Sequence, residues 1–232
     1  MRNPPIVVSL FEVRAYQIFF TVGLQYTTAS NSSLLLGTIP VWTAIIATAW
    51  RQERIARFQL LGILLSFAGS AVVIATGNGN LSLAWESFRG DILTVMTAIL
   101  AAAAAVMSKP LLQHYSALRL MSISWICGSL FLLPFGVPEM VTQDWAQASL
   151  GAWLALSYNI VLAGVLVWVI YLRSIGEIGA TGTAVYNTLI PPMAVLVAIL
   201  TLGERFTPWQ ALGAAVVLGG VMLTRLAPGN LS

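Results

Sequence analysis

Apolar residues along this chain form long runs that short polar segments separate. A helix needs about 20 apolar residues to cross the hydrocarbon core of a membrane, and eight runs approach or reach that length. They cover residues 6–26, 32–50, 58–77, 91–109, 118–136, 150–172, 180–202 and 208–224. The pattern therefore predicts an all-α fold, a polytopic membrane helical bundle of about eight transmembrane helices.

The composition supports a location in the lipid bilayer. Hydrophobic residues make up 58% of the 232 residues and charged residues 8%, whereas a soluble domain has about 25% charged residues. The net charge of +3 does not indicate a nucleic-acid partner, because the basic residues are scattered singly along the chain. The one cysteine, Cys127, lies in an apolar run and can form no disulfide within the chain.

The lysines and arginines favour one orientation in the membrane. If the N-terminus is cytoplasmic and eight spans alternate, nine basic residues, including Arg14, fall on the cytoplasmic side. Only Arg89 and Arg205 fall on the opposite side. This excess follows the positive-inside rule, so both termini are expected in the cytoplasm.

Two segments of the chain repeat each other. Residues 29–69 align with residues 180–220 without a gap, at a constant offset of 151. The identities of greatest weight are prolines, Glu-Arg pairs and glycines, namely Pro40 with Pro191, Glu53-Arg54 with Glu204-Arg205, Gly62 with Gly213 and Gly69 with Gly220. The span 32–50 would run toward the cytoplasm and the span 180–202 away from it. The two copies are therefore inverted, as in many secondary transporters, whose similar halves rock around a central site.

The repeated segments resemble the closing halves of the two EamA repeats of the drug/metabolite transporter superfamily. The resemblance rests on the prolines, Glu-Arg pairs and glycines just named. It implies a bacterial inner-membrane permease or exporter with ten helices in two inverted five-helix repeats. Here residues 1–77 are expected to supply three helices of a first repeat, 78–90 a linker, and 91–225 a five-helix second repeat. The first two helices of the family pattern are then absent from this sequence, either because the chain is an abbreviated relative or because its true start lies upstream of Met1.

These observations favour a membrane permease or exporter that moves a small organic metabolite, such as an amino acid or a drug, by alternating access. An enzyme is not expected, because the sequence has no nucleophile–base motif, metal-ligand spacing or nucleotide-binding loop. For the same reason no cofactor and no metal ion are expected. The alternative function is that of a non-transporting membrane subunit or truncated remnant, which needs a partner for the missing helices. A homodimer or a partner subunit stays open.

Two adjacent prolines mark the first group of candidate substrate-binding residues. Pro191 and Pro192 cannot bond to the carbonyl groups of Asn187 and Thr188, as residues of a regular helix would. The freed carbonyl groups and the side chains of Asn187, Thr188 and the adjacent Tyr186 would form a polar spot in the membrane, suited to an amine or hydroxyl group of a substrate. The alternative is a helix kink whose polar groups are satisfied locally.

Pro40 marks the second group. It is expected to kink the span 32–50 by freeing the carbonyl of Leu36, with Thr38 and Trp42 as the nearby candidate binding residues. The alternative is again a kink without a ligand.

Three further candidates lie in other spans. Tyr158 and Asn159 are polar residues in the middle of the span 150–172, so they should face protein rather than lipid. Substrate binding and hydrogen bonding between helices are equal alternatives for them. Trp125 could form an aromatic wall for an amphipathic substrate, although simple packing is the more common role of such a tryptophan.

Charged residues offer two more candidates. Glu12 lies inside the first span, so it is a candidate for coupling transport to protons, with a pair of Glu12 and Arg14 at the membrane interface as the alternative. The Glu-Arg pairs at 53–54 and 204–205 lie at span ends. A structural role is favoured for them, and a gating ion pair is the alternative.

Small residues recur every four positions in the third span. Gly62, Ser66 and Ser70 would lie on one face of a helix. Helices in lipid approach each other closely through such faces, so we expect a tight helix contact there.

Overall fold

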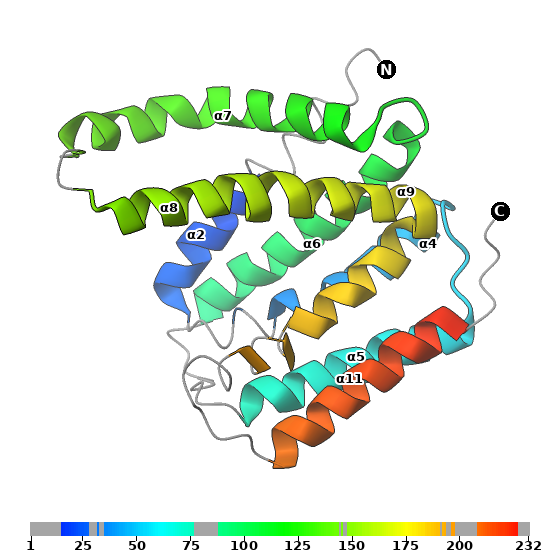
Figure 1. Ribbon diagram of the computed structural model, residues 1–232. Coiled ribbons are helices and arrows are strands. Elements are labelled where there is room, and N and C mark those ends of the chain that lie inside the picture. The colour runs from blue at the N-terminus through cyan, green and yellow to red at the C-terminus, as the bar shows by residue number, and fades with distance from the viewer. Residues whose placement is uncertain are drawn as a thin grey trace.

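The structure is a computed structural model, which describes residues 15–27, 32, 35–76, 88–143, 145, 148–190, 192–193, 196–197 and 208–226. All its named elements are helical (Figure 1). In chain order they are α2 (Tyr16–Tyr26), α4 (Ile39–Ala49), α5 (Arg57–Ala75), α6 (Phe88–Leu111), α7 (Ala117–Thr142), α8 (Leu150–Tyr158), η4 (Asn159–Leu166), α9 (Val167–Val185), η5 (Tyr186–Leu189) and α11 (Pro208–Leu226). Each of the eight predicted spans contains helix, so the all-α prediction is confirmed.

The helices have the length and composition of membrane elements. Two described stretches, Phe88–Leu111 and Leu150–Leu189, are long and apolar enough to cross a membrane. Shorter apolar helices cover Ile39–Ala49, Arg57–Val73, Ala117–Leu130 and Ala211–Thr224. Large apolar side chains such as Leu154 and Met222 are exposed along these helices, as a surface in contact with lipid requires.

The connection between the predicted spans 150–172 and 180–202 consists of a break at one residue. Helix α9 continues through this stretch, and Gly179 alone leaves the helical conformation, with φ of 83° and ψ of 166°. Glycine adopts such a positive φ without the steric cost that a Cβ would add. Gly179 therefore separates two helices, which correspond to the predicted sixth and seventh spans (Figure 1).

Helices α5 and α11 form a contact that we call the α5–α11 seam (Figure 1). A Cβ added at Gly62 would lie 2.6 Å from the carbonyl oxygen of Gly220, and one added at Gly213 would lie 2.9 Å from the carbonyl oxygen of Gly69. Glycines here allow the two backbones to touch, as in other tight helix pairs in lipid. The tight contact expected at Gly62 and Ser66 is confirmed.

The seam has the symmetry of an inverted repeat. Gly62 and Gly213 are equivalent in the two copies, and so are Gly69 and Gly220. The contact of Gly62 with Gly220 is therefore matched by that of Gly213 with Gly69. Ser66 and Val217 are also equivalent, and the Ser66 hydroxyl donates a hydrogen bond of 3.3 Å to the Val217 carbonyl. Such reciprocal contacts between antiparallel helices indicate a local two-fold axis.

The described turns lie at two ends of the bundle. One end, which we call the Glu53 end, contains the segment 50–56, the turn 112–116 and the break at Gly179. At the other end, the C-terminus of α2 meets the N-terminus of α6, where the Thr27 hydroxyl donates a 2.5 Å hydrogen bond to Asp91. The grouping of turns agrees with the alternation of spans that the sequence predicts.

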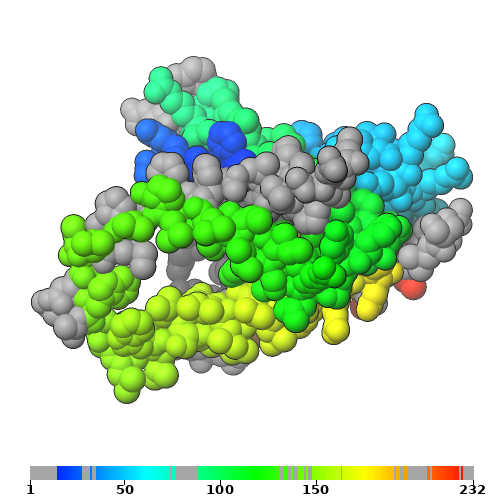
Figure 2. Space-filling model, turned by 90° about the horizontal axis from the view of Figure 1, so that it is seen from above, coloured from blue at the N-terminus to red at the C-terminus, as the bar shows by residue number. Residues whose placement is uncertain are grey.

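Helices α7 and α8 extend away from the rest of the bundle. Figure 2 shows a hollow between α7, drawn in green, and the rod of α8 and η4, drawn in yellow-green. The side chains of α8 are exposed along its whole length. This part of the chain therefore has the loosest packing among the described helices.

Candidate functional site

The two adjacent prolines leave two carbonyl groups without a partner in their own helix, and both carbonyl oxygens have another hydrogen-bond partner. The Ser70 hydroxyl of α5 lies 3.1 Å from the Thr188 carbonyl oxygen, which is the acceptor that the ring nitrogen of Pro192 cannot serve. The Asn187 carbonyl accepts from the backbone N–H of Ile190. These backbone acceptors are thus engaged within the protein, one by the neighbouring helix α5 and one within η5. Pro191 lies outside the described residues.

The side chains beside these carbonyls lie in the 3₁₀ helix η5. Tyr186 is half-buried and packs against the apolar cluster that contains Ile63 and Val217. Asn187 is half-buried, whereas Thr188 is buried and its hydroxyl donates to the Val185 carbonyl at 2.6 Å. Substrate binding by these three residues stays a prediction. The structure places them where α9 meets α5 and α11, so both repeats contribute to their surroundings.

Pro40 differs from the expectation of a kink inside a continuous helix. The chain turns at residues 37–38, and Pro40 lies in the first turn of α4. Proline is tolerated there because the first N–H groups of a helix have no partner within the helix. Thr38 and Trp42 form a local pair, in which the indole Nε1 of Trp42 donates to the Thr38 hydroxyl at 3.1 Å. That hydroxyl in turn donates to the Leu35 carbonyl.

Tyr158 and Asn159 do not face another described helix as expected. The side chain of Tyr158 is 62% exposed, and the exposed Asn159 amide donates to the Ala155 carbonyl of its own helix at 3.1 Å. The reason is the projection of α8 and η4 away from the bundle (Figure 2).

Trp125 of α7 contacts η4, since a Cβ added at Gly164 would lie 3.1 Å from the indole ring. Glu12 lies outside the described residues.

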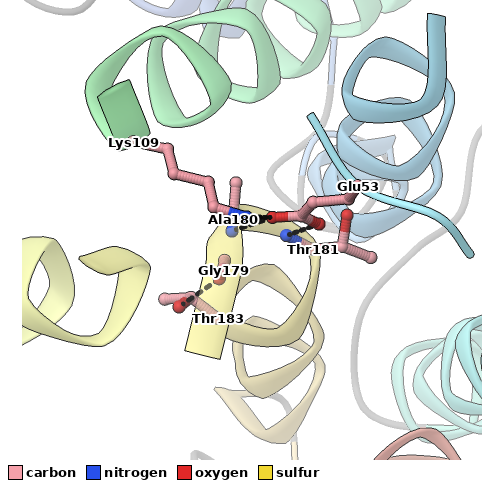
Figure 3. A network of polar contacts seen from close by, with 6 residues as sticks. All are labelled: Glu53, Lys109, Gly179, Ala180, Thr181 and Thr183. Atoms are coloured by element: carbon pink, nitrogen blue, oxygen red, sulfur yellow. Dashed lines mark hydrogen bonds and ion pairs between the residues drawn. The ribbon is translucent and has the colours of Figure 1, made fainter. Parts of the chain in front are cut away.

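A polar junction at the Glu53 end joins three segments of the chain (Figure 3). The Glu53 carboxylate follows α4 and accepts from the Lys109 ammonium at the end of α6, at 3.0 Å. It also accepts from the backbone N–H groups of Ala180 at 2.8 Å and Thr181 at 3.2 Å. We call these four residues the Glu53 junction.

The break in α9 makes this junction geometrically feasible. Because Gly179 leaves the helix, the N–H groups of Ala180 and Thr181 begin a new helical arm and have no helical acceptor. A carboxylate at a helix N-terminus satisfies such groups and the partial positive charge of the helix dipole. A Cβ at residue 179 would collide with the Glu53 carboxylate, so glycine is also needed for space.

The charges of the junction stabilise each other. Partial burial alone would raise the pKa of Glu53, but hydrogen bonds with Thr181 and Lys109, the positive charge of Lys109 and the Ala180 N–H together lower it below its ordinary value. Glu53 is therefore ionised at neutral pH. The Glu53 side chain is 14% exposed and that of Lys109 29%, so water reaches the edge of the pair.

Sequence reasoning missed the partners of Glu53. It considered Arg54 as an ion-pair partner, but Arg54 is exposed and Glu53 bonds to Lys109 instead. The available signal was Gly179 followed by the small residues Ala180 and Thr181 at the predicted start of a span. Among the described residues, no three His, Cys, Asp or Glu side chains are grouped so that they could hold a metal ion.

Comparison with known families gives one match over most of the chain. Residues 4–75 and 88–226 match the profile of the EamA-like transporter family. The gap between the two matched segments, residues 76–87, overlaps the linker expected at 78–90.

Several curated relatives are similar along almost the whole chain. An uncharacterized transporter of Archaeoglobus fulgidus is 29% identical, over 94% of this chain and 74% of its own length. The uncharacterized transporter YetK of Bacillus subtilis is 27% identical over 94% of this chain, which spans 66% of YetK. A probable terminal-alkyne amino-acid exporter of Streptantibioticus cattleyicolor is 28% identical over 90% of this chain and 68% of its own length. This chain thus spans about two thirds to three quarters of these relatives.

The fold has a counterpart among solved structures. One crystal structure of a protein superposes with a TM-score of 0.80 over 97% of this chain and 76% of its own. The two sequences are 16% identical. This likeness concerns the arrangement of the helices alone.

Proposed function

Because this chain belongs to the EamA-like transporter family, we propose that it is a permease or exporter that moves a small organic metabolite across the bacterial inner membrane by alternating access. The observation that supports this most strongly is the α5–α11 seam, in which equivalent residues of the two repeats make reciprocal contacts. Two inverted halves around a local two-fold axis can exchange their conformations, which gives two arrangements that open a central site to either side in turn.

The proposed substrate class is that of amino acids or similar small amphipathic molecules. The candidate side chains Tyr186, Asn187 and Trp125 are aromatic or neutral and polar, so they suit a molecule with an apolar part and a few hydrogen-bonding groups. The name of the Streptantibioticus cattleyicolor relative, an amino-acid exporter, supports the same class.

We place both termini in the cytoplasm, and with them the Glu53 end. The positive-inside bias of the sequence supports this orientation. Lys109 and the exposed Arg51 and Arg54 all lie at the Glu53 end, which agrees with it.

Counterflow in proteoliposomes tests the proposal. The purified chain is reconstituted with a high internal concentration of one amino acid, and uptake of the same labelled amino acid is measured across a panel. We expect counterflow for at least one member, and loss of it in Asn187→Ala with unchanged folding. The matched control is His114→Ala, in an exposed turn. Equal counterflow in wild type and Asn187→Ala would reject Asn187 as a binding residue.

The alternative function is a membrane subunit that needs helices from a partner. The exposure of α8 along its whole length favours it. On this alternative, the folded chain alone gives no counterflow with any member of the panel. Purification from native membranes in mild detergent should then yield a stable complex with a second membrane protein or with another copy.

A further inference from the structure

We propose that Glu53 is a positioning residue of the transport cycle, whose carboxylate holds the Glu53 end of the path closed until its bonds to Lys109, Ala180 and Thr181 are released. This inference rests on the proposed function. It concerns how one end of the path opens, and it assigns no role in substrate binding to Glu53.

The first argument is the set of segments that one side chain connects. Glu53 follows α4 in the first repeat, whereas Ala180 begins the second arm of α9 in the second repeat, 127 residues later. Lys109 lies at the C-terminus of α6. A single carboxylate therefore connects three segments that must separate if this end opens (Figure 3).

The second argument is that the junction is fixed to the end of α4 and lies next to a tightly packed apolar cluster. The backbone N–H groups of Gln52 and Glu53 both donate to the Ala47 carbonyl, which ties the carboxylate to the end of α4. Ala47 and Ala180 are fully buried and belong to one apolar cluster with Ala105 of α6. Their small side chains let α4, α6 and α9 come together and leave no space for water or substrate between them.

The third argument is that the bonds of the junction are exchangeable. Each is a hydrogen bond between a charged group and a donor, and the Lys109 side chain is already 29% exposed. When the segments separate, water can replace each partner of the carboxylate, so the net cost of opening is much smaller than the strength of the bonds in isolation. An apolar contact of the same area would have no such replacement.

The experiment measures the access of water-soluble reagents to the two ends separately. In a Cys127→Ser background, which removes the one native cysteine, Ser108→Cys places a thiol of similar shape beside Lys109 at a fully buried position. Ser32→Cys places a matched thiol at the opposite end, where Ser32 is 2% exposed and bonds to Thr94. The reaction rate of each thiol with a charged maleimide is measured on the purified full chain.

We expect Glu53→Gln to raise the labelling rate of the Ser108→Cys thiol about tenfold, because a charged hydrogen-bond acceptor is replaced by a weaker neutral one. The rate at Ser32→Cys should stay the same or fall. The control Arg54→Gln removes a charge from the adjacent exposed residue and should change neither rate. Glu53→Asp, which keeps the charge, should return the Ser108→Cys rate part of the way to that of the wild type.

Two results would overturn the proposal. One is an unchanged labelling rate at Ser108→Cys in Glu53→Gln, and the other is an equal rise at both ends, which a general loss of packing would produce. If Ser108→Cys does not fold, Ala105→Cys offers a second buried thiol in the same helix. Labelling needs no substrate, so a selective rise at the Glu53 end without counterflow in the wild type would reject the proposed function but not the role of Glu53 in closing this end.

Discussion

The two repeats meet at the α5–α11 seam and at the Glu53 junction, and these two contacts differ in chemistry. In the seam, glycines bring one backbone against another, with buried small side chains such as Ser66 between them. In the junction, one carboxylate reaches across to an ammonium and two N–H groups. The seam depends on shape, and the junction depends on charge.

This difference indicates which contact can move. A backbone contact at van der Waals distance is lost over a very small displacement, and nothing in lipid replaces it. A partly exposed charged group can exchange its partners for water. We therefore expect the seam to persist through the transport cycle as a fixed axis, while the junction breaks and reforms.

The largest effect is expected at the seam. Gly220→Ala places a Cβ 2.5 Å from the backbone nitrogen of Ser66 and 2.6 Å from the carbonyl oxygen of Gly62, and these backbone atoms cannot yield without separating the helices. We expect the free energy of unfolding to fall by about 3 kcal/mol, or the variant to fail to fold. The neighbouring Gly219→Ala meets no atom within 4 Å and should stabilise α11 by up to about 1 kcal/mol. Denaturant unfolding in detergent compares the two, and equal stabilities would contradict a tight seam.

The next largest effect is expected at the junction. Glu53→Ala leaves the Lys109 ammonium and the N–H groups of Ala180 and Thr181 without their acceptor. We expect a loss of about 2 kcal/mol in the free energy of unfolding, as for charged hydrogen bonds elsewhere. Arg54→Ala, at an exposed position, is the control and should change the stability by less than about 0.5 kcal/mol. A similar loss of stability in both variants would contradict a specific role of the Glu53 carboxylate.

A smaller effect is expected where the seam meets the candidate binding residues. Ser70→Ala removes the hydroxyl next to the buried carbonyl of Thr188 and leaves that carbonyl without this partner. We expect the free energy of unfolding to fall by about 1–2 kcal/mol. Ser122→Ala removes a hydroxyl that bonds to the carbonyl of its own helix near the surface, so it should cost less. The same unfolding measurement ranks the two variants, and the reverse order would contradict the role of Ser70.

The smallest effect is the pH dependence of the junction. The pKa of Glu53 is lower in the folded chain than in the unfolded one, so its contribution to stability is complete above the ordinary pKa of a glutamate. That contribution is lost as the pH falls through the lowered value of the folded state. The stability difference between wild type and Glu53→Gln should therefore be constant near neutral pH and shrink in acid. A difference that grows in acid would contradict the direction of the shift.

The sequence predicted the seam better than the junction. Gly62 and Gly213 repeat at a fixed offset, and small residues at a spacing of four predict close helix packing wherever they lie on one face. The spacing did not indicate which helix packs against this face. The observed pairing of α5 with α11, the equivalent helix of the other repeat, is consistent with the symmetry of the repeat. The eight apolar runs predicted the helices for the same reason, because span length follows directly from membrane thickness.

The junction could not be predicted, because its partners are far apart in the chain and two of them are backbone groups. The N–H groups of Ala180 and Thr181 exist at every residue and become available only because Gly179 breaks the helix. The sequence alone does not distinguish such a break from an ordinary turn. Tyr158 shows a further limit, since its polarity predicted a protein-facing position but its exposure depends on how α8 projects from the bundle.

The hydrogen bond from Ser66 to Val217 has a consequence for the origin of the chain. These residues occupy the same position in the two repeats and touch each other. If the repeats arose by duplication, the ancestor was a half-length chain. Two separate molecules of it would have met here, each with the same residue at the contact. The seam would then have been a subunit interface before it became internal, and the serine facing a valine today would mark where the two copies have diverged.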